Sequence, residues 1–155
     1  MKKLLLSLSV FAALLTSCTG TKKSVQLLQS AGFDTTLVGK KVALYTLQNE
    51  NGMTVQITNY GARIVALWVP DKSGEMKDVV WGFSSIKDYL TATDVCAGPI
   101  VGRYANRIGK GRFTLDGKSY QLTLNNNGNQ LHGGSKGFFT KVWGARQLKN
   151  AAGED

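Results

Sequence analysis

The stretch Arg112–Tyr120 reads RFTLDGKSY and decides the fold class of this chain of 155 residues. The Asp116-Gly117 pair at its centre is typical of a type I′ turn between two antiparallel strands, because both turn positions need a positive φ. A two-residue turn fixes the strand register, so Phe113 is expected to lie directly across from Tyr120. The stretch therefore predicts a β-hairpin.

The residues before this hairpin show the same type of pattern. Residues 42–47 form an apolar run that is closed by the turn pair Asn51-Gly52. In residues 53–58, Met, Val and Ile alternate with Thr, Gln and Thr, which is typical of a half-buried strand. Three further apolar runs predict strands at residues 64–69, 79–83 and 137–145.

Residues 84–90 are the exception and predict a short helix. Ser84 or Ser85 can cap this helix, and three apolar residues at i, i+3 and i+4 share one of its faces, namely Ile86, Tyr89 and Leu90. The other segments from residue 42 onward are predicted to be strands joined by glycine turns. The predicted fold class is therefore all-β, an antiparallel β-sandwich.

The first residues have a different character. Met1-Lys2-Lys3 is basic, and residues 4–15 form an apolar run that is too short to span a bilayer. The following Leu15–Cys18 (LTSC) resembles the bacterial lipobox, which implies cleavage before Cys18, lipid attachment to this cysteine and export to a bacterial membrane surface. An ordinary signal peptide with an incidental cysteine is the alternative. We expect a signal peptide at 1–17, a tether at 18–40 and a sandwich domain at 41–155.

Charge and cysteine content exclude several classes of function. The formal net charge is +9, but the charged residues are scattered singly, so we interpret them as a solvated surface and expect no nucleic-acid partner. Once Cys18 is assigned to the lipid, Cys96 has no partner and is expected to be a small core residue. One histidine and one further cysteine predict no metal site.

The only histidine, His132, is the first candidate for chemistry. It precedes Gly133-Gly134, and two glycines let the backbone approach a ligand closely. An imidazole can donate to or accept from a sugar oxygen near neutral pH. A histidine that is merely satisfied by a backbone carbonyl is an equally good interpretation of the residue alone.

Arg103, Asn106 and Arg107 form the second candidate group. In an extended segment the two arginines share one face and Asn106 lies on the other, whereas a turn would change this arrangement. Their donors and the carboxamide oxygen suit sugar hydroxyls or carboxylates, although a surface cation pair is at least as common. Two other sets favour structural roles: a loop at Asn125–Asn129, and core aromatics at Trp68, Trp81 and Trp143.

These motifs occur together and in a fixed order. They are NYGA (59–62), DVVWGF (78–83), GRYANRI (102–108), GRFTLDG (111–117), NQLHGG (129–134) and Gly137-Phe138 followed by Trp143. Together they resemble the N-terminal half of the aldose 1-epimerase (galactose mutarotase) family. The resemblance implies a large antiparallel β-sandwich that interconverts the α and β anomers of free hexoses without a cofactor.

The resemblance also implies roles for individual residues. Asn106 and Arg107 match substrate contacts of the family, and His132 matches its first active-site histidine, near the ring oxygen of the sugar. The family's general acid is a second histidine and its base a glutamate, both in the C-terminal half, and this chain has one histidine. We therefore expect a partial copy that folds poorly and is inactive alone. A non-catalytic carbohydrate-binding lipoprotein is the alternative.

Overall fold

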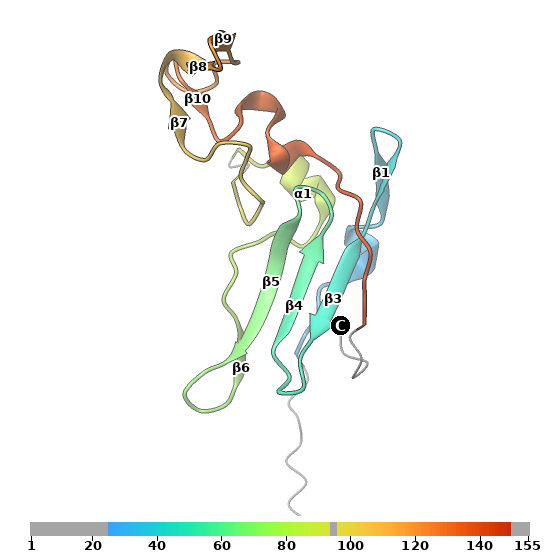
Figure 1. Ribbon diagram of the computed structural model, residues 1–155. Helices are drawn as coiled ribbons and strands as arrows, with labels where there is room; N and C mark the ends of the chain where they lie inside the picture. The colour runs from blue at the N-terminus through green and yellow to red at the C-terminus, as the bar shows by residue number, and fades with distance from the viewer. Residues whose placement is uncertain (1–24, 94–95, 150–155) are drawn as a thin grey trace, which may run out of the picture.

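The computed structural model describes residues 25–93 and 96–149 of the chain (Figure 1). Strands dominate it, and the strand pairs that it describes are antiparallel. The strands are β1 Thr35–Leu37, β2 Lys40–Val42, β3 Leu44–Gln48, β4 Thr54–Thr58, β5 Arg63–Pro70, β6 Met76–Asp78, β7 Arg107–Ile108, β8 Arg112–Leu115, β9 Lys118–Gln121 and β10 Gln130–Leu131. The predicted all-β, antiparallel fold class is confirmed.

A four-stranded sheet with the order β3-β4-β5-β6 is the largest element of the structure (Figure 1). The turn at Asn51-Gly52 joins its first two strands, as the sequence predicted, with Gly52 at a φ of 84°. A register shift between Gln56 and Ile57 interrupts the pairing of β4 with β5. The sheet carries the segment that contains the candidate residues at one of its ends (Figure 1).

The alternation in β4 is present, but the polar side chains are the more deeply buried set. Thr54, Gln56 and Thr58 are buried, whereas Val55 and Ile57 are only partly buried. The reason is the N-terminal segment on the polar face: the carboxamide of Gln56 accepts from the backbone N–H of Leu28 (2.9 Å) and donates to its carbonyl (3.2 Å). The amide of Gln56 is thereby satisfied, which removes the usual cost of burying it.

The folded body begins earlier than the predicted boundary at residue 41. A 3₁₀ turn, η1, spans Ser30–Gly32, and β1 pairs with β2 directly after it. Phe33 is completely buried and belongs to the core together with Val42, Val65, Ile86 and Tyr89. The prediction of a tether is therefore wrong for residues 30–40, because one aromatic side chain in a polar stretch anchors them to the core.

Arg63 joins the sheet to the segments that follow it. Its guanidinium donates to the carbonyls of Ala97 (2.8 Å) and Phe139 (3.1 Å) and lies over the rings of Tyr60 and Tyr89. Burial lowers the pKa of this guanidinium from its ordinary value, and burial likewise raises the pKa of the Tyr89 hydroxyl. A buried cation thus links strand β5 to a chain segment far along the sequence.

The predicted helix is confirmed as α1, Ile86–Thr91. The hydroxyl of Ser85 accepts from the backbone N–H of Asp88 (3.2 Å), which is the expected N-cap. Ile86 and Tyr89 are buried as predicted, but Leu90 is exposed because the core reaches only one side of this short helix.

The hairpin of β8 and β9 has the predicted turn and register. Asp116 and Gly117 have φ angles of 49° and 72°, as a type I′ turn requires. Phe113 pairs with Tyr120, and their rings stack with centroids 4.9 Å apart. Both strands are exposed along their whole length.

Two predicted strands are wrong. In residues 79–83, only Val79 continues the ladder, because the carboxylate of Asp78 accepts from the backbone N–H groups of Leu67 and Val80. In residues 137–145, the chain instead forms the 3₁₀ turn η4 (Phe138–Thr140) and a single bridge between Val142 and Tyr60.

Several burial predictions are also wrong. Trp68 is buried, but Trp81 is 82% exposed and Trp143 is exposed as well. Cys96 is exposed and is no core residue. Trp81, Cys96 and Trp143 lie on segments without regular structure. An apolar sequence in such a segment does not ensure that another part of the chain covers its side chains.

The predicted signal peptide and lipid-attachment residue Cys18 lie outside the described residues. Among the described residues, the helices are too short and too polar to cross a membrane.

Candidate functional site

Strand pairing brings the two candidate motifs together. β7 (Arg107–Ile108) pairs with β10 (Gln130–Leu131), and Leu131 lies opposite Arg107. His132 directly follows β10, and Asn106 directly precedes β7. The antiparallel pairing therefore places these two residues side by side at one end of the short ladder. Each of the two strands has only two residues, and this short pairing aligns the two motifs.

His132 and Asn106 are connected by two hydrogen bonds. The backbone N–H of His132 donates to the carbonyl of Asn106 (2.9 Å), and the backbone N–H of Asn106 donates to Nδ1 of His132 (3.0 Å). Since Nδ1 accepts a hydrogen, the neutral imidazole carries its proton on Nε2. The imidazole is therefore held by a backbone amide rather than by a carbonyl, and its Nε2–H is a donor.

The Arg107 guanidinium is held by two carboxamide oxygens. Its Nε donates to Oδ1 of Asn126 (2.9 Å) and its Nη1 to Oδ1 of Asn106 (3.1 Å). Asn106 has a φ of 55°, so the segment turns here and the extended arrangement, with Asn106 opposite both arginines, does not occur. Asn106 therefore contacts both His132 and Arg107, and the three predicted residues form one cluster.

Arg103 lies outside this cluster. Its guanidinium lies over the ring of Phe138, 5.7 Å from the centroid. The two arginines thus lie in different environments: asparagine side chains hold Arg107, whereas the guanidinium of Arg103 packs over an aromatic ring.

The asparagine-rich loop has a larger role than its sequence indicated. Asn127 and Gly128 are left-handed, as the loop prediction implied. Beyond this, Asn125 brackets Leu131 by accepting from its N–H (2.7 Å) and donating to its carbonyl (3.0 Å), while Asn126 holds Arg107. In the sequence, the four asparagines within five residues are the feature that could have indicated these positioning residues, because asparagine side chains readily bond to nearby backbone groups.

Glycine is required after His132 by a close backbone crossing. His132, Gly133 and Gly134 all have positive φ angles, of 51°, 90° and 76°. A Cβ at Gly133 would lie 1.9 Å from the carbonyl oxygen of Gly102, which is an impossible contact. The crossing thus fixes the position of the histidine turn against the GRYANRI segment.

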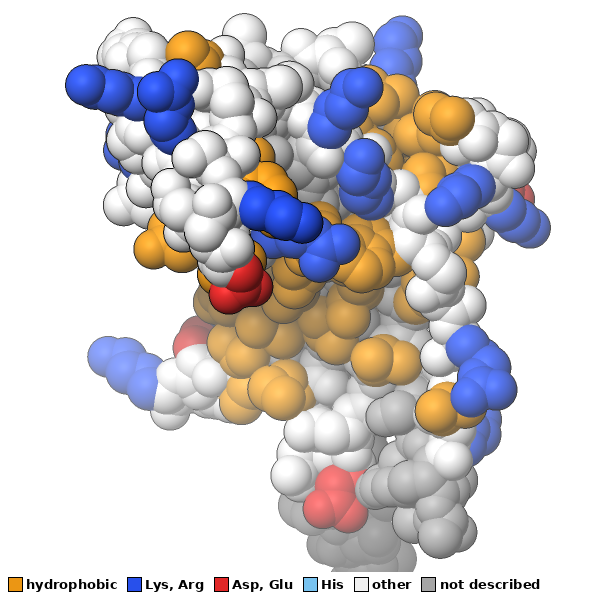
Figure 2. Space-filling view, turned by 45° about the horizontal axis from the view of Figure 1, so that its top comes forward, with side chains coloured by type: hydrophobic (Ala, Val, Ile, Leu, Met, Phe, Trp, Pro, Cys, Tyr) orange, Lys and Arg blue, Asp and Glu red, His pale blue; other side chains and the backbone are white. Residues whose placement is uncertain are grey.

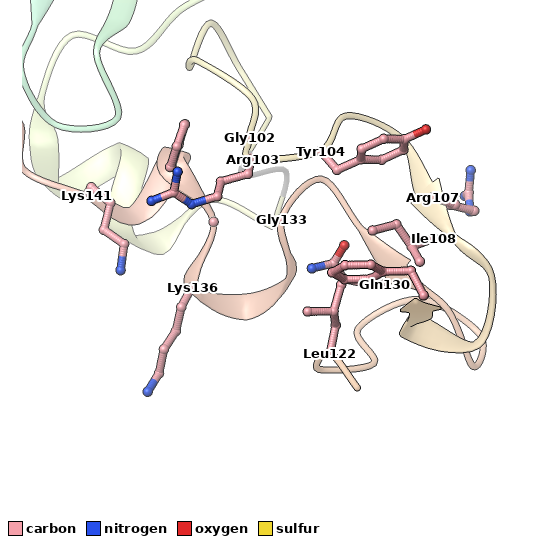
Figure 3. A pocket seen from close by; sticks show the side chains of 13 residues that line it. Gly102, Arg103, Tyr104, Arg107, Ile108, Leu122, Gln130, Gly133, Lys136 and Lys141 are labelled. Atoms are coloured by element: carbon pink, nitrogen blue, oxygen red, sulfur yellow. The ribbon is translucent and has the colours of Figure 1, made fainter. Parts of the chain in front are cut away.

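A cleft of about 750 Å³ adjoins the cluster: Arg107 lines it, and so does Gly133, the residue after His132 (Figure 3). Tyr104, Ile108 and Leu122 lie on one side of it, and Arg103, Lys136 and Lys141 on the other (Figure 3). A volume of this size lies in the range of small-molecule sites. Among the described residues, no group of three or more metal-binding side chains occurs.

Comparison with protein families decides to which family the chain belongs. The family model of aldose 1-epimerase matches residues 43–155. The chain belongs to the aldose 1-epimerase family. The GRYANRI and NQLHGG segments, which carry Asn106, Arg107 and His132, both lie within the matched region.

Individual relatives of the aldose 1-epimerase family agree with this assignment. Galactose mutarotase of Sus scrofa is 47% identical over 109 residues, which cover 70% of this chain and 31% of the relative. Aldose 1-epimerase of Escherichia coli is 35% identical over 105 residues, covering 68% and 30%. This chain therefore spans about a third of the length of these relatives.

Two solved structures have the same fold over the part of the chain that they match. A GalM/aldose epimerase homologue from C. elegans superimposes with a TM-score of 0.64 at 34% identity, over 69% of this chain and 33% of the homologue. A galactose 1-epimerase from Lactobacillus acidophilus gives 0.63 at 29% identity, over 77% and 34%.

Proposed function

We propose that this chain carries the substrate-holding part of an aldose 1-epimerase, an isomerase that interconverts the α and β anomers of free hexoses. One observation carries the proposal: the family motifs meet in space, so that a single asparagine, Asn106, holds both His132 and Arg107. The comparisons support the family, and the hydrogen bonds of the cluster support the binding role of these residues.

The reaction requires one proton to leave and one to arrive. A base takes the proton of the anomeric hydroxyl, the bond between C1 and the ring oxygen breaks, and an acid protonates that oxygen. Rotation about the C1–C2 bond and closure of the ring then give the other anomer. Because the same groups act in both directions, no net proton is consumed.

His132 suits the position next to the ring oxygen. Its Nε2–H is directed away from the bond to Asn106 and has no hydrogen-bond partner among the described residues. Donation from Nε2 to the ring oxygen would stabilise the negative charge that develops as the C1–O bond breaks. Arg107 and Asn106 provide further donors for the hydroxyl groups.

We assign a supporting role to His132, with the principal acid and base outside this chain. The sequence holds one histidine, and the carboxylate nearest in sequence to the cluster, Asp116, lies at the tip of the exposed hairpin. The chain alone would then bind a hexose weakly and leave its anomers to interconvert at the rate in buffer.

Polarimetry of freshly dissolved α-glucose tests this assignment. We expect the purified chain to leave the rate of mutarotation at the buffer value, while glucose shifts the amide resonances of Asn106 and Arg107. Acceleration that is lost in His132→Ala would show that the chain is sufficient for catalysis. Glucose that leaves both resonances unchanged would contradict the binding role.

We also propose that the chain is exported and anchored to a bacterial membrane through lipid on Cys18. The order of a basic start, an apolar run and LTSC supports this proposal. Metabolic labelling with palmitate in a bacterial host should label the chain, and Cys18→Ser should abolish the label. Cys96→Ser is the matched control and should keep it, and equal labelling of both variants would refute the proposal.

A further inference from the structure

The charges of this chain are divided unequally along its length. Residues 25–93 hold six Lys and Arg against six Asp and Glu, so their formal charge is zero. Residues 96–149 hold nine Lys and Arg against Asp116 alone, which gives +8. The individual basic residues are scattered in sequence, and on one face of the molecule Lys and Arg side chains surround an apolar area (Figure 2).

The cleft beside His132 lies within this positive part. Arg103, Lys136 and Lys141 form its cationic wall, and none of the three makes a salt bridge with a carboxylate of the described residues. Apart from Asp116 at the tip of the hairpin, the carboxylates of the described residues all lie within residues 25–93. Three cations with no salt-bridge partner in the part of the chain that the structure describes, around a cleft with apolar surfaces, create a positive potential that attracts an anion.

The opposite wall suits the body of a sugar. Ile108, Phe113 and Leu122 present apolar surface, on which the C–H faces of a pyranose can pack. Between the two walls the carboxamide of Gln130 points into the cleft (Figure 3). The residue is only 7% exposed, and its Oε1 has no hydrogen-bond partner among the described residues.

An unpaired buried carbonyl oxygen is costly, and it calls for a donor. A sugar hydroxyl that reached this oxygen would be such a donor, whereas a chloride or sulfate ion could only accept. The cleft therefore combines the carboxamide of Gln130 in its lining, a place for a ring on the apolar wall, and a place for negative charge on the cationic wall.

We propose that this cleft selects sugars that carry an anionic group, with the carboxylate or phosphate held by Lys136, Lys141 and Arg103. The inference rests on the proposed function, since the cleft adjoins the cluster of Asn106, Arg107 and His132 and shares Arg107 with it. A uronic acid and a sugar phosphate share the required chemistry, a pyranose with one charged substituent, and charge-assisted hydrogen bonds to the cations would hold either one.

Titration of the full chain with four probes tests the proposal, namely glucose, glucuronate, glucose 6-phosphate and inorganic phosphate. We expect at least one anionic sugar to bind about ten times more tightly than glucose in low salt, with a preference that declines as NaCl is added. The side-chain amide resonance of Gln130 should shift with the sugars. The stronger of glucuronate and glucose 6-phosphate identifies the anionic group.

Lys136→Gln/Lys141→Gln removes two charges from the wall and should reduce the tenfold preference to about twofold. Lys118→Gln is the matched control, because Lys118 is exposed on β9 and does not line the cleft. Lys118, Lys136 and Lys141 are all exposed, so the variants are expected to fold.

The outcomes separate this inference from the function on which it rests. Equal affinity for glucose and the anionic sugars overturns the substrate class and leaves the epimerase proposal standing. Inorganic phosphate that binds as tightly as the anionic sugars also overturns it, because the cleft would then recognise the ion alone. If no sugar binds, both proposals fail.

Discussion

His132 and Asn106 hold each other through two backbone amides, one of which donates to the imidazole itself at 3.0 Å. The orientation of the imidazole therefore depends on the backbone of a segment that lies on another strand. Any change that displaces Asn106 displaces the donor of His132 with it. Substitutions at this pair can separate the holding role of Nδ1 from the binding role of Nε2.

His132→Asn should keep the first role and lose the second. Asparagine tolerates the φ of 51° at this position, and its carboxamide oxygen can replace Nδ1 as acceptor for Asn106. We expect near-normal stability, with binding of the preferred sugar weakened by about 1 kcal/mol, the usual value of one hydrogen bond. Calorimetric titration measures the affinity, and His132→Ala, which loses both roles, should be less stable. Unchanged affinity in His132→Asn would exclude Nε2 as a sugar donor.

Gln130→Leu should raise stability and weaken sugar binding at the same time. Leucine has a similar volume and removes a buried oxygen that has no partner among the described residues, a group that costs about 1–3 kcal/mol. Urea unfolding should show the gain, and titration with the preferred sugar should show the loss. Gln121→Leu is the contrasting variant, because the carboxamide of Gln121 is hydrogen-bonded to the carbonyls of Lys110 and Gly111 and its loss should destabilise. A loss of stability in Gln130→Leu would contradict the prediction.

Gly133→Ala should prevent the histidine turn from forming. The new Cβ would meet the carbonyl oxygen of Gly102, and the backbone φ of 90° is strained for alanine. Gly74→Ala is the control, since Gly74 has a φ of 79° but no other atom lies within 4 Å of the place that an added Cβ would take, so that it should cost only about 1–2 kcal/mol. Thermal unfolding compares the two variants. Equal destabilisation would mean that the close crossing carries no energetic weight.

Arg63→Met should destabilise the chain by about 3 kcal/mol, because one buried and one partly buried carbonyl lose a charged donor. Arg112→Met is the matched control on the exposed hairpin, where a surface substitution changes stability by about 0.5 kcal/mol or less. Denaturant unfolding measures both. Amide hydrogen exchange at Thr140, whose N–H follows the held carbonyl of Phe139 and donates to the carbonyl of Gly137 (3.1 Å), should also accelerate in Arg63→Met, and unchanged exchange would contradict the linking role.

The local elements were predictable from the sequence, and the reason is physical. The Asp116-Gly117 turn and the Ser85 cap depend on contacts within a few residues, so their signals are complete in a short window. The cluster of Asn106, Arg107 and His132 was identified because its motifs resemble those of a family.

Long-range features could not be predicted in the same way. The sequence of residues 79–83 suits a strand, but the Asp78 carboxylate takes the N–H groups that a ladder would use. The exposure of Trp81 depends on which segment covers it, and this is a property of the whole fold. The contacts of Asn125 and Asn126 depend on the pairing of β7 with β10, which two-residue strands scarcely indicate.

The hold of Gln56 on Leu28 has a consequence for self-association. A carboxamide has the same donor and acceptor as a peptide group, so this one side chain satisfies both polar groups of a backbone unit, as a neighbouring strand would. At Leu28 the N-terminal segment consequently offers no free peptide group that could recruit a strand from another molecule. A single polar side chain in the sheet thus protects this part of the chain from edge-to-edge polymerisation.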